Sequence, residues 1–175
     1  MILIAIGSNL SGPAGPPRAQ CEAAIERLAL RGIAIVARSP WYESEPVPPS
    51  DQPWFVNGVV AVESSLKPVE LLAALHDVEQ GLGRKRAIVN AARTIDLDLL
   101  DHEGVVRDGP EPPLLPHPRM HQRRFVLRPL VDVASGWRHP VSGATAAELL
   151  AALPAEGDVR PLAGDPTGRQ GRRPV

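Results

Sequence analysis

The chain has 175 residues and a net charge of −1, with 43% hydrophobic and 22% charged residues. This composition is that of an ordinary globular protein with a sizeable core, and it excludes a mainly disordered chain. The charge provides no overall attraction for nucleic acid, the single cysteine excludes a disulfide framework, and no apolar run is long enough to span a bilayer. We therefore expect no nucleic-acid or membrane partner and, without a signal peptide, a cytoplasmic location.

The first part of the chain predicts two strands, one helix and a stiff loop. Residues 2–6 form a short apolar run that stops at a Gly-Ser-Asn turn, which indicates a strand. Residues 18–30 carry apolar side chains near helical spacing, and residues 33–38 have strand character. Four prolines between residues 44 and 53 exclude a helix or a central strand there, so a loop is expected.

The second part continues the pattern. Residues 54–63 predict a strand, and a helix is expected to begin at Pro68, with its apolar residues recurring on one face. Residues 94–100 alternate between polar and apolar positions, which predicts another strand. The order βαββαβ favours an α+β fold, a ferredoxin-like sandwich, with additional C-terminal helices at residues 119–134 and 145–152.

The domain organisation is expected to be simple. No internal repeat divides the chain, so residues 1–163 are expected to form a single domain. Residues 164–175 are rich in Gly, Pro and Arg, and we expect them to form a disordered tail.

Asp96 and Asp98 are the most informative pair of residues. In a strand, residues i and i+2 project from the same face, about 6.6 Å apart along the chain. Two convergent carboxylates suit Mg²⁺, which is usually bound by one or two carboxylates together with phosphate oxygens. For an Asp-x-Asp pattern alone, a solvated strand face is the alternative interpretation.

Cations lie close to this pair in the sequence. Arg84, Lys85, Arg86 and Arg93 all lie within the ten residues 84–93. Carboxylates that bind a metal beside guanidinium groups suit a polyphosphate, because metal and arginine can bind different oxygens. The alternative is a charge-balanced surface with ordinary ion pairs.

One histidine and two aromatic residues are further candidates. His117 lies between two prolines, ahead of the pair Arg123-Arg124, which favours a positioned donor, although a lone histidine is more often structural. Phe55 follows the proline-rich loop and Phe125 follows the arginine pair. Their rings could stack on a planar heterocycle, although core packing explains either one alone.

Taken together, these segments resemble the 6-hydroxymethyl-7,8-dihydropterin pyrophosphokinase family of folate biosynthesis. The most specific match is Arg-Thr-Ile-Asp-Leu-Asp-Leu-Leu at residues 93–100, and matching stretches extend from about residue 4 to residue 130. The resemblance implies transfer of pyrophosphate from ATP to the pterin hydroxymethyl group, with release of AMP and with two Mg²⁺ ions as cofactors. Its implied partners are ATP and the dihydropterin, with other folate-pathway enzymes as further candidates.

The resemblance also implies roles for individual residues. The expected catalytic residues are Arg84, Arg93, Asp96 and Asp98, of which the two aspartates match the metal ligands. The expected nucleotide-binding residues are Glu79, Arg84, Arg86, Arg93, Leu99, His117 and Arg123. The expected substrate-binding residues are Gly7, Ser44, Val47, Phe55, Asn57 and Phe125. In this arrangement the two phenylalanines sandwich the pterin and Asn57 reads its polar edge.

One four-residue stretch and two single positions depart from the family pattern. Residues 89–92 are Val-Asn-Ala-Ala where Arg-Trp-Gly-Pro is frequent, Glu45 replaces a common proline, and Pro112 replaces a basic residue. Two alternatives therefore stay open: an inactive, pterin-binding relative, and a ferredoxin-like module that binds RNA or a nucleotide. The second is disfavoured because residues 94–100 lack the stacking aromatic side chains of an RNA-binding sheet.

Overall fold

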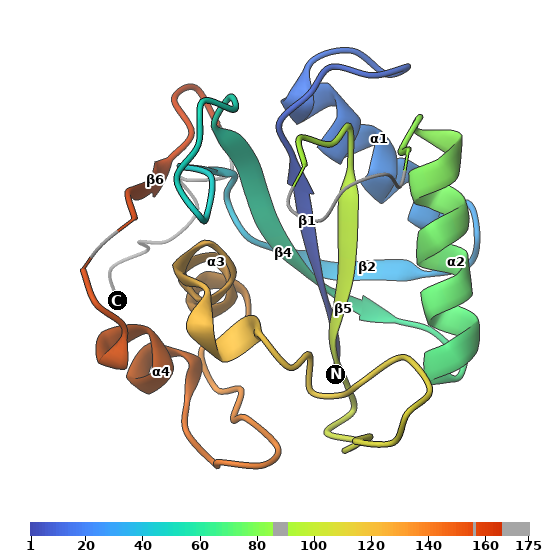
Figure 1. Cartoon of the computed structure of the whole chain (residues 1–175). Coiled ribbons are helices and arrows are strands. Elements are labelled where there is room, and N and C mark those ends of the chain that lie inside the picture. Colours follow the sequence, from blue (N-terminus) through green and yellow to red (C-terminus); the bar gives the residue numbers. More distant parts are fainter. Residues whose placement is uncertain (86–90, 156, 166–175) are drawn as a thin grey trace, which may run out of the picture.

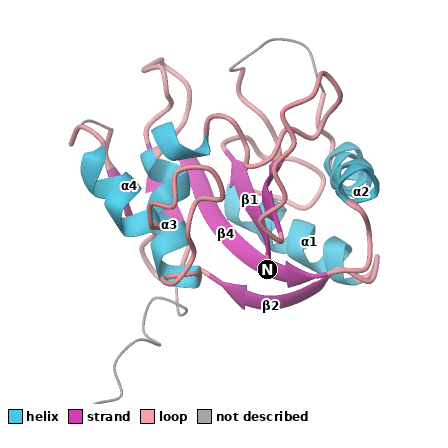
Figure 2. Ribbon diagram, turned by 90° about the horizontal axis from the view of Figure 1, so that it is seen from below, coloured by secondary structure: helices cyan, strands magenta, loops and turns pink. Residues whose placement is uncertain are grey.

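An antiparallel β-sheet lies between two layers of helices in the computed structural model, which describes residues 1–85, 91–155 and 157–165 (Figure 1). The strands are β1 (Ile2–Ser8), β2 (Ala34–Arg38), β3 (Tyr42–Ser44), β4 (Phe55–Glu63), β5 (Asp96–His102) and β6 (Val159–Pro161). The helices are α1 (Pro17–Ala29), α2 (Pro68–Gly81), α3 (Arg124–Val133) and α4 (Ala146–Ala152), with a short 3-10 helix, η1 (Met120–Gln122), before α3. In both Figure 1 and Figure 2, α1 and α2 lie on one side of the sheet and α3 and α4 on the other.

Strand β1 lies inside the sheet, between β4 and β5. The strand order is β5-β1-β4-β3-β6, β2 also pairs with β4, and every pair between these strands is antiparallel. In the two registers of β1, Gly7 lies opposite Asn57 on one side and Asp96 on the other. The pairing therefore brings together candidate site residues that are far apart in the sequence.

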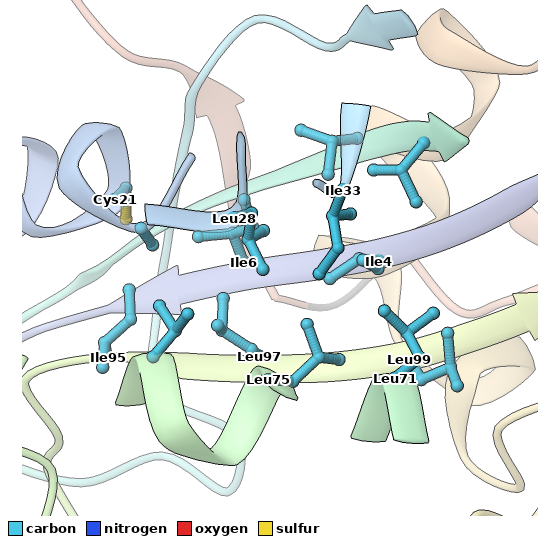
Figure 3. Close-up of a cluster of buried hydrophobic side chains, with 14 of the residues drawn as sticks. Ile4, Ile6, Cys21, Leu28, Ile33, Leu71, Leu75, Ile95, Leu97 and Leu99 are labelled. Carbon is cyan, nitrogen blue, oxygen red and sulfur yellow. The ribbon is translucent and has the colours of Figure 1, made fainter. Parts of the chain in front are cut away.

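Apolar side chains from the strands and from helices α1 and α2 fill the space between the sheet and these two helices. Figure 3 labels ten of them: Ile4, Ile6, Cys21, Leu28, Ile33, Leu71, Leu75, Ile95, Leu97 and Leu99. Leu97 and Leu99 of β5 are no more than 3% exposed. Asp96 and Asp98, which alternate with them, keep partly exposed side chains. The predicted alternation is confirmed, and it fixes the face of the carboxylates, since a one-residue slip would expose both leucines.

The second core lies between the sheet and helices α3 and α4. Here the register of β1 and β5 shifts between Leu3 and Ile4, which leaves Leu3 opposite Asp101. Such a bulge ends the regular alternation of the strand. Asp101 is buried, and its Oδ2 accepts a hydrogen bond of 2.6 Å from Nε1 of Trp137, which satisfies a group that is costly to bury alone.

The structure corrects one predicted helix and adds two strands. The helix expected at residues 119–134 is divided into η1 and α3, because Arg123 between them has extended backbone angles (φ −120°, ψ 105°). β3 and β6 were not predicted, since three residues are too few for a periodic pattern. The helix expected at residues 145–152 is confirmed as α4, and Thr145 caps its start by accepting a hydrogen bond from the Glu148 amide.

The described helices are all too short or too polar to cross a membrane. Of the predicted tail, residues 166–175 lie outside the described part of the chain, whereas Gly164 and Asp165 lie within it.

Candidate active site

Two cavities meet at the acidic pair of β5. Asp96 and Asp98 line both of them. The first cavity lies under the proline-rich loop and is bordered by every residue predicted to bind the substrate: Gly7, Ser44, Val47, Phe55, Asn57 and Phe125. The second lies toward α2 and is bordered by four of the residues predicted to bind the nucleotide: Glu79, Arg84, Leu99 and His117. A ligand in either cavity would therefore reach the same two carboxylates.

The polar wall of the first cavity is built where β1 and β3 end and β4 begins. Ser44 lies opposite Phe55 in the register of β3 and β4. Nδ2 of Asn57 donates a hydrogen bond of 2.7 Å to Oγ of Ser44, and both side chains are buried. A Cβ at Gly7 would lie 3.0 Å from Oδ1 of Asn57, so glycine gives the amide room to lie over β1. These contacts hold Asn57 in one orientation at the cavity wall.

A chain of charges links α2 to the acidic pair. Glu79 is 2% exposed, and its Oε1 accepts a hydrogen bond of 2.7 Å from the Leu97 amide of β5. The same oxygen pairs with Arg84, whose Nη1 also lies 2.5 Å from Oδ1 of Asp96. Burial lowers the pKa of Arg84, but Asp96 and Glu79 outweigh it and raise the pKa, so this guanidinium stays charged. Asp96 is thereby held in place through α2.

The other oxygen of Asp96 pairs with a second arginine. Nη1 of Arg93 lies 2.6 Å from Oδ2 of Asp96. Two hydrogen bonds with Asn9 fix the backbone of Arg93. The backbone N–H of Arg93 donates to Oδ1 of Asn9 at 2.8 Å, and the backbone N–H of Asn9 donates to the Arg93 carbonyl at 3.1 Å. Nδ2 of Asn9 donates to Gln52 and to the Pro53 carbonyl of the proline-rich loop. Asn9, which is 2% exposed, joins the two loops that border the acidic pair.

Asn9 was not among the residues singled out from the sequence for a role. The Gly-Ser-Asn stretch that ends the first predicted strand was recognised as a turn, which places Asn9 but does not indicate its partners. The signal that could have found it is the chemistry of the residue, because a buried asparagine needs hydrogen-bond partners for both ends of its amide.

Asp98 has its own cationic partners. Nη1 of Arg123 lies 3.3 Å and Nε2 of His117 lies 3.8 Å from Oδ2 of Asp98. The guanidinium of Arg123 also lies over the ring of Phe125, 5.5 Å from its centroid. Burial lowers the pKa of His117. The negative charge of Asp98 raises this pKa but only partly offsets the effect of burial, and the positive charges of Arg123 and Arg119 lower it further. His117 is therefore neutral at neutral pH, and one ring nitrogen is free to donate.

The remaining predicted residues are placed less centrally. Leu99 belongs to the hydrophobic core and only borders the second cavity. Arg93 and Arg123 line the first cavity rather than the second, although both pair with the carboxylates between them. Arg86 and the departures at residues 89–90 lie outside the described residues.

The donor set suits a divalent cation beside a polyphosphate. The side chains of Asp96 and Asp98 are 22% and 30% exposed, so their oxygens can be reached from both cavities. Among the described residues, no group of three His, Cys, Asp or Glu side chains forms a ready-made metal cage. Mg²⁺ is compatible with such a sparse site, since it commonly uses one or two carboxylates and takes its other ligands from phosphate and water. Three arginines balance the three carboxylates Glu79, Asp96 and Asp98, so a bound divalent cation would add the positive charge that an anionic ligand needs.

Known proteins resemble this chain in architecture or in sequence. The solved Plasmodium falciparum HPPK-DHPS triple mutant with SDX-DHP superimposes with a TM-score of 0.68 over 86% of this chain and 43% of its own, at 14% identity, which is a likeness of fold. A family model described as 7,8-dihydro-6-hydroxymethylpterin-pyrophosphokinase (HPPK) matches residues 3–135. The chain belongs to this family.

Two curated relatives agree with this assignment. The 2-amino-4-hydroxy-6-hydroxymethyldihydropteridine pyrophosphokinase of Pseudomonas aeruginosa is 43% identical over 157 residues, which cover 89% of this chain and 93% of the relative. Folic acid synthesis protein fol1 of Schizosaccharomyces pombe is 36% identical over 88% of this chain, which spans only 20% of that longer protein. Family membership favours the pyrophosphokinase over the RNA- or nucleotide-binding module considered from the sequence.

Proposed function

We propose that the chain transfers a pyrophosphoryl group from ATP to the hydroxymethyl group of 6-hydroxymethyl-7,8-dihydropterin, giving the pterin diphosphate and AMP in folate biosynthesis. The observation that carries the proposal is the position of Asp96 and Asp98, which border both cavities. An acceptor in the first cavity and a polyphosphate reached from the second would meet at these carboxylates. Phosphoryl transfer requires mainly positioning and charge stabilisation, and this site offers both.

The first cavity suits the pterin. Phe55 and Phe125 provide aromatic faces for a planar ring, and Val47 of the proline-rich loop adds an apolar contact. Asn57, oriented by Ser44, presents a fixed amide to the donors and acceptors at the ring edge. Such a wall of fixed polar groups discriminates strongly among heterocycles, because a mismatched ligand would leave them unpaired.

The arginines suit the phosphates of ATP. Arg84 and Arg93 lie on either side of Asp96, and Arg123 lies beside Asp98. Guanidinium groups can bind phosphate oxygens through two parallel hydrogen bonds, and they stabilise negative charge as it shifts toward the leaving group. Neutral His117 adds a donor that does not depend on protonation near neutral pH.

Asp96 and Asp98 would hold two Mg²⁺ ions with the triphosphate. When bound, such ions neutralise phosphate charge and orient the reacting groups. The aspartates supply hard oxygen ligands, and Glu79 and β5 keep those ligands on one face. Arg84 and Arg93 would then be released from Asp96 to bind the phosphates.

Two further parts of the proposal concern architecture and partners. The strand order, with β1 between β4 and β5 and with β2 and β3 outside β4, supports a ferredoxin-like sandwich extended by α3, α4 and β6. The Plasmodium chain named HPPK-DHPS is more than twice the length that this chain covers. The joint name HPPK-DHPS supports the proposal that this chain contacts another folate-pathway enzyme.

A product assay tests the reaction directly. The protein is incubated with ATP, Mg²⁺ and 6-hydroxymethyl-7,8-dihydropterin, and the nucleotides are separated. AMP is expected only when both the pterin and the metal are present. ADP would instead indicate a single-phosphate kinase, and dihydropterin binding without any turnover would identify an inactive relative.

Phe125→Ala tests the stacking proposed for the first cavity. We expect the Kd for the dihydropterin to rise about tenfold to a hundredfold, since loss of base–aromatic stacking costs about 1–3 kcal/mol in comparable sites. The Kd for ATP should change far less, and Phe125→Tyr, which keeps the aromatic face, should stay near the wild-type values. Titration calorimetry with each ligand provides the comparison, and equal losses for both ligands would count against stacking.

A further inference from the structure

A C-terminal segment, residues 158–165, lies outside the residues 3–135 that match the family and pairs with strand β3. In the register of β3 and β6, Ser44 lies opposite Val159 and Glu43 lies opposite Arg160. The segment continues along the chain before β3, where the Leu162 amide donates to the Trp41 carbonyl at 2.8 Å. The segment therefore covers the edge of the strand that leads into the proline-rich loop.

Arg160 contacts both ends of that loop. Its Nε donates a hydrogen bond of 3.0 Å to Oε2 of Glu43, the residue before Ser44. Its guanidinium lies over the ring of Trp54, 4.4 Å from the centroid, and Trp54 directly precedes Phe55. One side chain thus joins the residue that precedes Ser44 to the residue that precedes Phe55.

The loop between these ends forms part of the first cavity. Residues 45–48 border it, as do Ser44 and Phe55 at the two strand ends. The backbone contributes a second link at the same place, because the Glu45 amide donates to the Asp158 carbonyl at 3.4 Å. Residues 157–159 also border a third cavity together with Ser44 and Phe125.

We infer that Arg160 is a positioning residue for the dihydropterin, which holds the two ends of the proline-rich loop so that Ser44 and Phe55 keep their places in the first cavity. This inference rests on the proposed function. Arg160 has no contact with the first cavity itself in the described structure and acts through Glu43 and Trp54.

The exposure of Arg160 separates positioning from global stability. Its side chain is 57% exposed, and its pair with Glu43 is solvated, so its loss should have little effect on the free energy of unfolding. Small displacements of groups that orient a substrate are more costly for binding and reaction than for folding. A change confined to one substrate is therefore the expected signature.

Arg160→Ala is compared with Arg138→Ala, a matched variant of another exposed arginine, whose Nη1 donates to the Gly143 carbonyl in a different loop. For Arg160→Ala we expect the KM for the dihydropterin to rise about fivefold, because the two loop ends lose the contacts that hold them, with the KM for ATP unchanged and the Tm lowered by no more than about 2–4 °C. Arg160→Lys keeps a cation over Trp54 and should recover part of the loss. Amide hydrogen exchange of residues 44–56, measured without substrates, should be faster in Arg160→Ala alone.

The outcomes separate this inference from the proposed function. A KM for the dihydropterin equal to that of Arg138→Ala, or equal increases for both substrates, would overturn the positioning role. Unchanged hydrogen exchange of residues 44–56 would do the same without any turnover. Absence of AMP from the wild-type protein would overturn the proposed function instead, whatever the exchange of the loop.

Discussion

Asp96→Asn and Asp98→Asn are each expected to reduce kcat by about a thousandfold or more, a loss typical of removing a group that stabilises transition-state charge. Asparagine keeps the size and one oxygen of the side chain but removes the negative charge that would bind Mg²⁺. Both aspartates lie on the face of β5 opposite Leu97 and Leu99, so the core should be unaffected. Turnover should therefore fall without a comparable fall in Tm.

The measurement is AMP formation at saturating ATP and dihydropterin over a range of Mg²⁺ concentrations. Asp108→Asn, a change at an exposed aspartate outside both cavities, provides the matched control and should keep wild-type turnover. Turnover within a few-fold of wild type in either site variant would exclude the metal role of that residue.

The sequence predicted the strands and helices whose patterns are local and long enough to read. Residues 94–99, which include the first half of β5, alternate between polar and apolar side chains, and the fourteen residues of α2 carry a repeated apolar face after Pro68. β3 and β6 have three residues each, and their pairing joins residues 42–44 to residues 159–161, so neither length nor local pattern could reveal them. The sequence did not predict the extended backbone of Arg123, because the residues on both sides of it also suit a helix.

The sequence predicted which residues form the site better than it predicted which of their side chains pair with one another. Ser44 and Asn57 were placed together because both match one family pattern, and they do border the same cavity. The pairing of Arg84 and Arg93 with Asp96, and of Arg123 with Asp98, depends on register and side-chain direction that sequence spacing does not supply. The contacts of Arg160 with Glu43 and Trp54 could not be predicted either, because no sequence pattern relates an arginine near the C-terminus to these two residues.

Arg93→Ala is expected to lower kcat by about a thousandfold, the range found when an arginine that stabilises a phosphoryl transition state is removed. Two hydrogen bonds with Asn9 fix the backbone of Arg93, and the Asp96 carboxylate lies within reach of its guanidinium. Without phosphates this cation balances Asp96. With Mg²⁺ and ATP bound, it would be free to bind the phosphates.

Single-turnover kinetics and equilibrium binding distinguish this role from a structural one. Arg93→Ala should retain the dihydropterin Kd within a few-fold, because Phe55, Asn57 and Phe125 are unchanged. Arg93→Lys should recover only part of kcat, since an ammonium group cannot form two parallel hydrogen bonds to phosphate. Arg31→Ala, at an exposed arginine in the turn after α1, should leave kcat unchanged. If Arg93→Ala instead weakens dihydropterin binding as much as it lowers kcat, Arg93 maintains the first cavity and does not stabilise the transition state.

The double variant of Arg93→Ala with Asp96→Asn tests whether the two residues act together. Because Arg93 and Asp96 form one charged unit, the fall in kcat of the double variant should be much smaller than the product of the two single falls.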